Sequence, residues 1–252
     1  MSQWQSYTFF ILGALLFLLL MKLWFTKVNS NFTKELLAHF DVENGDVTKS
    51  VAFVLAHPDD ESMFFTPLLE LLRVTPEFAH QHIKLNLLSL SKGKCGDQRT
   101  FELEEVCHKY NISCSILDEV HSPDSPNFWD ANKVSERVEA FVKDKKAAVL
   151  FTFDQYGASG HPNHISVHNA VINMKARYPD VTVMRLHTYG LVAKYTALLA
   201  ILRAMFTGTS VIKFSPMEVM RNMKIHHSQW KPHLYVWSFF GSYSYCNTFH
   251  RL

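Results

Sequence analysis

The longest run of hydrophobic residues lies near the start of the chain. Tyr7–Phe25 contains nineteen residues that are apolar apart from Thr8 and Lys22, close to the ~20 needed to cross a hydrocarbon core. Lys22 lies near one end, where its long stem can reach the membrane interface. A cleaved signal peptide fits less well, because Met1–Ser6 contains no Lys or Arg and no small-x-small cleavage site follows. We therefore predict a transmembrane anchor.

Short apolar segments then alternate with segments of helical periodicity. Strands are predicted at Val51–Leu55, Ile83–Leu90, Ser113–Leu117, Ala147–Phe153 and Val181–Leu186. Helices are predicted near Ser62–Arg73, Gln98–Tyr110, Asn132–Lys146 and Asn163–Arg177. Residues 26–50 are polar and indicate a linker or short helix. The alternation predicts an α/β domain over residues 51–252, with a Rossmann-like, mostly parallel sheet and helices on both faces.

Two later segments depart from this pattern. Tyr195–Phe206 is apolar but contains Arg203, and it is too short for a confident second span. It is either a core helix or a segment that rests on the membrane beside the anchor. The aromatic stretch Leu234–Phe249 is expected to form an edge hairpin, with aromatic anchoring at a membrane interface as the alternative.

Charge and cysteine content narrow the class of protein. The 25 Lys and Arg residues nearly balance the 23 Asp and Glu residues, so nothing indicates nucleic-acid binding. No C-x-x-C spacing occurs, and reduced thiols in a cytosolic domain are expected, with two disulfides as the alternative. The cysteines are Cys95, Cys107, Cys114 and Cys246.

Positive charge flanks only the C-terminal side of the anchor, at Lys22, Lys27 and Lys34. The positive-inside rule then places the N-terminus outside or in a lumen and the domain in the cytosol. Two glycosylation sequons, beginning at Asn31 and Asn111, favour the opposite orientation. Such triplets often arise by chance, so the charge asymmetry carries more weight.

Two polar clusters each follow an apolar strand. Ala56–Glu61 reads AHPDDE and His161–His164 reads HPNH. In an open parallel sheet, the loops at the carboxyl ends of strands form the ligand site, so the clusters are expected to meet. Two histidines and one carboxylate with an open position are typical of catalytic zinc. Such a metal lowers the pKa of water and polarises a carbonyl oxygen.

The remaining residues of the clusters fit hydrolytic chemistry. Asp59 could accept the proton of the attacking water, and the spare histidine could stabilise an oxyanion. An Asp-Asp pair before a helix is also typical of N-capping. The same ligand set suits a non-haem iron oxygenase, so the residues alone define the type of site better than the reaction.

The two clusters, with FDQYGASGHPNH at Phe153–His164, resemble the N-acetylglucosaminylphosphatidylinositol de-N-acetylases, part of a broader family of metal-dependent sugar deacetylases. The resemblance extends from about Val51 to Gln229. It implies a role for each residue of the site. The metal ligands are His57, Asp60 and His164, the general base is Asp59, and the oxyanion is stabilised by His161.

Two further segments match the family more loosely. Gly96–Glu102 resembles its G-x-x-R-x-x-E segment, which implies that Arg99 contacts substrate. His226–Gln229 resembles its H-x-S-Q segment, which implies that His226 lies at or near the site. The alternatives are an exposed i, i+3 pair of Arg99 with Glu102, and a helical histidine that faces the core.

The resemblance also implies a reaction and a location. The reaction is removal of acetate from N-acetylglucosaminyl-phosphatidylinositol, an early step of glycosylphosphatidylinositol-anchor biosynthesis. The resemblance implies zinc, a glycolipid substrate and a single-pass endoplasmic reticulum protein whose domain faces the cytosol. A deacetylase of a soluble sugar and a non-catalytic membrane protein that retains the metal site are the alternatives. The sequence identifies no protein partner.

Overall fold

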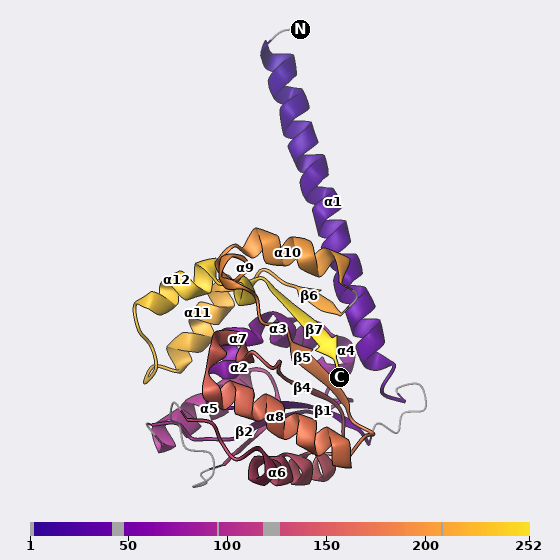
Figure 1. Cartoon of the computed structure of the whole chain (residues 1–252). Helices are drawn as coiled ribbons and strands as arrows, with labels where there is room; N and C mark the ends of the chain where they lie inside the picture. The colour runs from indigo at the N-terminus through magenta and orange to yellow at the C-terminus, as the bar shows by residue number, and fades with distance from the viewer. Residues whose placement is uncertain (1–2, 42–47, 95, 118–126, 208) are drawn as a thin grey trace.

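The computed structural model describes residues 3–41, 48–94, 96–117, 127–207 and 209–252. Helix α1 (Gln3–Leu37) extends away from the domain (Figure 1). Its segment from Tyr7 is long and apolar enough to cross a membrane. The helix then continues into the domain, where Val28, Phe32 and Leu36 are buried at four-residue spacing. Of the linker or short helix expected at residues 26–50, the part as far as Leu37 is helical, and it packs into the core as the end of α1.

The described strands form one seven-stranded sheet in the order β3-β2-β1-β4-β5-β7-β6. The strands are β1 (Ser50–Leu55), β2 (Leu85–Ser89), β3 (Ile112–Ile116), β4 (Ala147–Phe153), β5 (Thr182–Leu186), β6 (Ser210–Ile212) and β7 (Cys246–Arg251). The first five pair in parallel, and β7 is antiparallel to both β5 and β6. The predicted mostly parallel α/β fold is confirmed.

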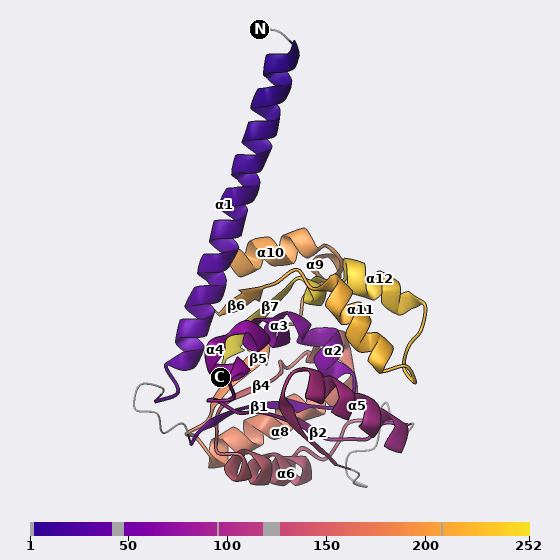
Figure 2. The same ribbon diagram turned by 180° about the vertical axis from the view of Figure 1, so that it is seen from behind.

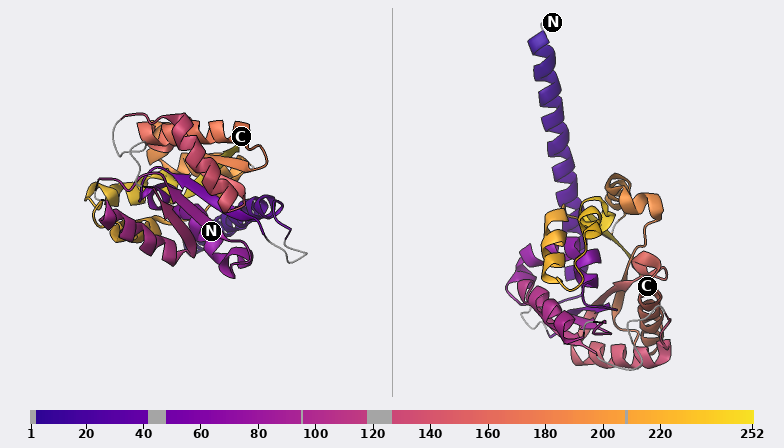
Figure 3. Two further views of the ribbon diagram at one scale, coloured as in Figure 1. Left: turned by 90° about the horizontal axis from the view of Figure 1, so that it is seen from below. Right: turned by 90° about the vertical axis from the view of Figure 1, so that its left-hand side faces the viewer.

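Helices cover both faces of the sheet. They are α2 (Asp60–Phe64), α3 (Thr66–Val74), α4 (Pro76–Ala79), α5 (Asp97–Lys109), α6 (Ala131–Asp144), α7 (Gly157–Gly160), α8 (Pro162–Arg177), α9 (Leu191–Tyr195), α10 (Ala197–Phe206), α11 (Pro216–Ile225) and α12 (His233–Phe240). In Figures 1 and 2, α6 and α8 lie on one side of the sheet, and α3 with the end of α1 lies on the other. Figure 3 shows the same layers from two further directions.

The core is rich in aromatic rings that join distant parts of the chain. Phe32 of α1 meets Phe151 of β4 and Phe249 of β7, with ring centroids 6.4 and 5.8 Å apart. Phe53 of β1 stacks on Phe151 at 5.3 Å. These contacts fix α1 against the sheet, because burying each such ring contributes on the order of 1.5–3 kcal/mol.

Several element boundaries differ from the prediction. The helix expected at Ser62–Arg73 divides into α2 and α3, because Pro67 in the first turn of α3 has no N–H to continue the α2 ladder. The hairpin expected at Leu234–Phe249 is wrong: this segment forms α12, a 3₁₀ turn and the start of β7. The apolar segment Tyr195–Phe206 is one short helix, α10, preceded by the end of α9.

The cysteines also differ in part from the prediction. Cys107 and Cys114 form a disulfide with Cα atoms 6.4 Å apart. The turn between α5 and β3 reverses the chain and brings these two residues together. Cys246 is a free, buried thiol as expected, and Cys95 lies outside the described residues.

Candidate active site

The two polar clusters meet at the point where the strand order reverses. From β1 the chain crosses to β2 and β3 on one side, and from β4 it crosses to β5 on the other, while β1 and β4 are direct neighbours. Such a switch point opens a crevice at the carboxyl ends of the strands. The loop after β1 carries His57 and Asp59, and the loop after β4 leads to His161 at the start of α8.

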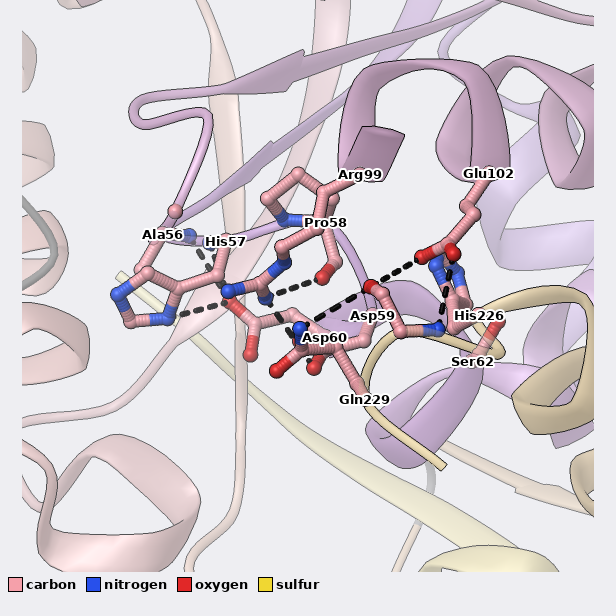
Figure 4. A network of polar contacts seen from close by, with 12 residues as sticks. Ala56, His57, Pro58, Asp59, Asp60, Ser62, Arg99, Glu102, His226 and Gln229 are labelled. Carbon is pink, nitrogen blue, oxygen red and sulfur yellow. Dashed lines mark hydrogen bonds and ion pairs between the residues drawn. The ribbon is translucent and has the colours of Figure 1, made fainter. Parts of the chain in front are cut away.

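Three side chains converge in this crevice. His57, Asp60 and His164 each direct one ligand atom to a common point, and these atoms lie within 4.8 Å of one another. All three residues are less than 8% exposed. Asp60 is held by backbone N–H donors, since its Oδ2 accepts from Ala56 and His57 at 3.0 and 2.9 Å (Figure 4). Its Oδ1 lies 3.1 Å from His164 Nε2.

Hydrogen bonds on the outer side of each imidazole assign the tautomers. His164 Nδ1 lies 2.9 Å from the carbonyl oxygen of Gly157, which can only accept, so Nδ1 carries the proton. Asn163 Nδ2 donates to the Asn127 carbonyl, which leaves its Oδ1 to accept from His57 Nε2 at 3.0 Å. In the neutral form of each ring, the lone pair therefore faces Asp60.

This arrangement fits a divalent cation. Two imidazole lone pairs and a carboxylate oxygen face one another, which is unfavourable unless a proton or a metal ion lies between them. Burial lowers the pKa of His164, but the Asp60 charge outweighs burial and the net shift is upward. Burial likewise raises the pKa of Asp60, but the charges of His164 and His57 outweigh it and hold the carboxyl ionised. The described residues thus supply an N₂O ligand set with oriented outer partners.

Asp59 stands beside this set in an unusual conformation. Its backbone φ is 121°, a region that non-glycine residues rarely adopt. Its side chain is 16% exposed and pairs with Arg99, whose Nη2 lies 3.2 Å from Asp59 Oδ2 (Figure 4). Burial raises the pKa of Asp59 to about 7, although the Arg99 charge acts to lower it. A carboxyl group with a pKa near neutrality can both accept and return a proton.

A buried ion pair, formed by Glu61 and His226, holds the backbone of Asp59. Glu61 Oε2 accepts from the Asp59 backbone N–H at 3.1 Å, and Glu61 Oε1 lies 2.6 Å from His226 Nε2. Neither Glu61 nor His226 is exposed. The structure places His226 two contacts from Asp59, with Glu61 between them; a part for His226 in the reaction stays a prediction. The role of Glu61 could not be found in the sequence, because its partner lies 165 positions away.

His161 lies beside the cluster and is partly exposed. Its ring centroid is 5.2 Å from those of both His57 and His164. Its Nδ1 accepts from the Asn163 backbone N–H at 3.2 Å and so caps α8. In the neutral ring the proton then resides on Nε2, which makes that nitrogen a hydrogen-bond donor.

Arg99 and Glu102 do not form the exposed pair considered from the sequence. They are 4% and 3% exposed, and each binds a different loop. Arg99 donates to the carbonyl oxygen of Pro58 at 2.5 Å as well as to Asp59. Glu102 accepts from the backbone N–H and hydroxyl of Ser228 at 2.9 and 2.6 Å. Both residues therefore join α5 to the site.

Two residues of the cluster escaped sequence reasoning. Phe153 stacks on His164 with centroids 4.3 Å apart and planes inclined by 3°. Asn163 orients His57, and its place between the two histidines of HPNH was the available signal. Both residues fix an imidazole plane, which a metal site requires.

Known proteins of similar sequence indicate the family of this chain. The family model for the GlcNAc-PI de-N-acetylases (PIG-L) matches residues 52–175. A bovine N-acetylglucosaminyl-phosphatidylinositol de-N-acetylase is 32% identical over 200 residues, which cover 73% of this chain and 76% of that protein. The chain belongs to this family. A probable enzyme of the same name from Schizosaccharomyces pombe is 33% identical, over 60% of this chain and 62% of that protein.

Solved structures show the same fold. The N,N'-diacetylchitobiose deacetylase from Pyrococcus horikoshii superposes with a TM-score of 0.51 and 13% sequence identity, over 81% of this chain and 84% of that one. At this identity the likeness concerns the fold alone.

The alignment with the S. pombe relative covers less than two thirds of the length of that protein.

Proposed function

We propose that this protein hydrolyses the acetamide of N-acetylglucosaminyl-phosphatidylinositol, giving glucosaminyl-phosphatidylinositol and acetate in glycosylphosphatidylinositol-anchor biosynthesis. The observation that carries the proposal is the convergence of His57, Asp60 and His164 beside Asp59 in a chain of this family. The bovine and S. pombe relatives are named for this reaction.

His57, Asp60 and His164 would hold the metal, which we propose to be zinc because two imidazoles and one carboxylate form a common zinc set. When bound, such an ion acidifies water and polarises the amide carbonyl. The protein contributes the orientation: Asn163 and Gly157 fix the two imidazoles, and backbone N–H groups fix the carboxylate.

The remaining chemistry belongs to Asp59 and His161. Asp59 takes a proton from the attacking water as the water oxygen bonds to the acetamide carbon. The Nε2–H of His161 donates to the oxygen that becomes negative. When the C–N bond breaks, Asp59 returns its proton to the departing sugar nitrogen. Arg99 holds Asp59 in place, and its expected contact with substrate remains a prediction.

The decisive experiment uses the full chain with acetyl-labelled N-acetylglucosaminyl-phosphatidylinositol in detergent micelles. Released acetate is measured with the metal-loaded protein, after chelation, and after zinc is restored. We expect activity to fall to background on chelation and to return with zinc. His164→Ala should lose bound metal as well as activity. A folded, metal-loaded wild-type chain that releases no acetate would refute the proposal.

We propose that α1 spans the endoplasmic reticulum membrane once and leaves the domain in the cytosol. Lys22, Lys27 and Lys34 on one side of the apolar segment support this orientation. Asn111 offers a reporter, because it is exposed in the turn between α5 and β3. In cells, endoglycosidase treatment is expected to leave the mobility of the chain unchanged. A shift that disappears in Asn111→Gln would place the domain in the lumen.

Gly93→Ala is expected to reduce kcat without loss of the fold. A Cβ at Gly93 would lie 2.2 Å from Arg99 Nη1, and its φ of 72° adds backbone strain. Displacing Arg99 moves the carboxylate of Asp59, and a misplacement of about 1 Å can cost on the order of 10²-fold in rate. Steady-state kinetics and circular dichroism measure both effects. Gly190→Ala is the control, since a Cβ there meets nothing within 4 Å; equal losses in the two variants would contradict the prediction.

A further inference from the structure

A band of exposed apolar side chains lies on the domain where α1 leaves it. We call this band the α9-α10-α12 face. Its exposed residues are Leu191, Val192, Tyr195, Leu198, Leu199, Leu202, Phe206, Tyr235, Val236, Phe239 and Phe240. Figures 1 and 2 show α9, α10 and α12 on the side of the domain toward which α1 extends. Contiguous exposed apolar area of this kind marks an interaction surface.

Helix α10 is apolar on both sides. Its inner side packs Ala200, Ile201 and Ala204 into the domain. Its outer side carries Leu198, Leu202 and Phe206 at four-residue spacing, with exposed fractions of 62, 42 and 76%. Apart from Arg203, the exposed residues of this helix are apolar. An outer side of this kind is expected to be covered by a partner or by lipid.

Contacts with helix α1 indicate that lipid covers the outer side of α10. Trp4 and Trp24 are 81% and 44% exposed and lie twenty residues apart, which is ~30 Å along a helix and equals the thickness of a hydrocarbon core. Tryptophan is enriched at both membrane interfaces. Trp24 donates from Nε1 to the carbonyl oxygen of Met205 at 3.3 Å, and its ring meets Phe206 at 5.8 Å. With α1 as a membrane span, the end of α10 therefore lies at the level of the membrane interface nearer to the domain.

We infer that the α9-α10-α12 face rests in the interfacial layer of the same bilayer that α1 crosses. The inference rests on the proposed function in taking α1 as a membrane span and the substrate as a membrane lipid. Arg203 on α10 and Lys27, three residues after Trp24 on α1, are exposed, and cations near a membrane surface favour anionic headgroups. The domain is thus held by two attachments, a spanning helix and an interfacial surface.

This placement brings the active site close to the lipid. Tyr195 of the face contacts Trp237, which contacts Phe64, which contacts His164, with centroids 5.9, 5.8 and 5.7 Å apart. A short chain of rings thus separates the ligand cluster from the face. A sugar headgroup could reach the site while the acyl chains remain in the bilayer.

The test measures lipid contact directly. The full chain is reconstituted in nanodiscs of phosphatidylcholine and phosphatidylinositol whose acyl chains carry a doxyl quencher. A fluorescent amino acid replaces Leu202, Phe240 or, as control, the exposed Glu136 of α6 on the far side of the domain. We expect severalfold stronger quenching at positions 202 and 240 than at 136. Equal quenching at all three would overturn the inference, and quenching that depends only on the number of chains per disc would instead identify a second copy as the cover. No turnover is needed, so the result does not depend on the proposed reaction.

A kinetic comparison adds an independent readout. Leu198→Glu/Leu202→Glu removes the apolar face of α10, and Val74→Glu is the matched change at an exposed apolar residue of α3. The double variant should raise KM severalfold for the substrate embedded in vesicles, with unchanged kcat/KM on a short-chain soluble analogue. Val74→Glu should change neither. A double variant that matches the wild type on vesicles, or that loses both activities while folded, would contradict the inference.

Discussion

Replacement of Asp59 by asparagine is expected to lower kcat by about 10²–10⁴-fold, the range that general-base catalysis contributes. The amide has the size of the carboxyl group but cannot accept the proton of water. Asparagine and aspartate share the same tolerance of positive φ, so the change adds no backbone strain of its own at the φ of 121°. Because the proposed metal ligands are His57, Asp60 and His164, bound metal should remain near one ion per chain.

Acetate release, metal analysis by mass spectrometry and circular dichroism together separate the base from the metal site. Asp130→Asn is a matched control, because Asp130 caps α6 by accepting from the N–H groups of Asn132 and Lys133. Asparagine caps a helix about as well as aspartate, so this variant should keep wild-type kcat. If Asp59→Asn retained a tenth or more of the wild-type kcat, another group would have to serve as the base.

The elements that the sequence predicts well are those whose pattern is local. Strand β4 occupies Ala147–Phe153 as predicted, because a continuous apolar run between two helical patterns predicts a buried parallel strand in an α/β protein. The aromatic run Leu234–Phe249 was misread as a hairpin, because aromatic residues suit a strand and a half-buried helix equally. Short apolar runs of this kind are decided by tertiary packing.

In the site, too, residues were predictable where their spacing in the sequence is short, and contacts between distant segments were not. The spacing of His57 and Asp60, repeated in His161 and His164, was enough to predict that four side chains share one edge of the sheet. The partners that orient them were not predictable. The contact of Arg99 with Asp59 depends on how α5 folds back over the loop after β1. Such contacts come from the packing of helices, which one sequence does not encode in any local pattern.

The second large effect is a loss of stability, expected when the Glu61–His226 ion pair next to Asp59 is broken. Glu61→Gln and His226→Gln should each lower the free energy of unfolding by ~3–5 kcal/mol, because each leaves a buried charge without its partner. The double variant should lose less than the sum of the two, since no charge is then stranded. Urea unfolding of the detergent-solubilised chain measures all four corners of the cycle. Single variants within about 0.5 kcal/mol of the wild type would show that the pair carries no net stability.

The pH dependence of the same pair has a definite sign. Burial lowers the pKa of His226, but the Glu61 charge outweighs it and the folded value lies above 6.5. This contribution is complete below pH 6.5 and is lost as the pH rises through the folded value. Burial raises the pKa of Glu61, but His226 outweighs it and the folded value lies below 4.5. That contribution is complete above pH 4.5 and is lost as the pH falls through the folded value.

The pair therefore stabilises the domain most between about pH 4.5 and 6.5, the window between the unfolded pKa values of the two groups. Both groups are charged in the folded state throughout this window. The difference in unfolding free energy between the wild type and the double variant should be largest there and should decline on both sides. A difference that stays constant from pH 4 to 8 would mean that neither group changes its pKa on folding. In that case the charges of Glu61 and His226 would add nothing to stability, and the strained backbone of Asp59 would depend on the hydrogen bond from its N–H to Glu61.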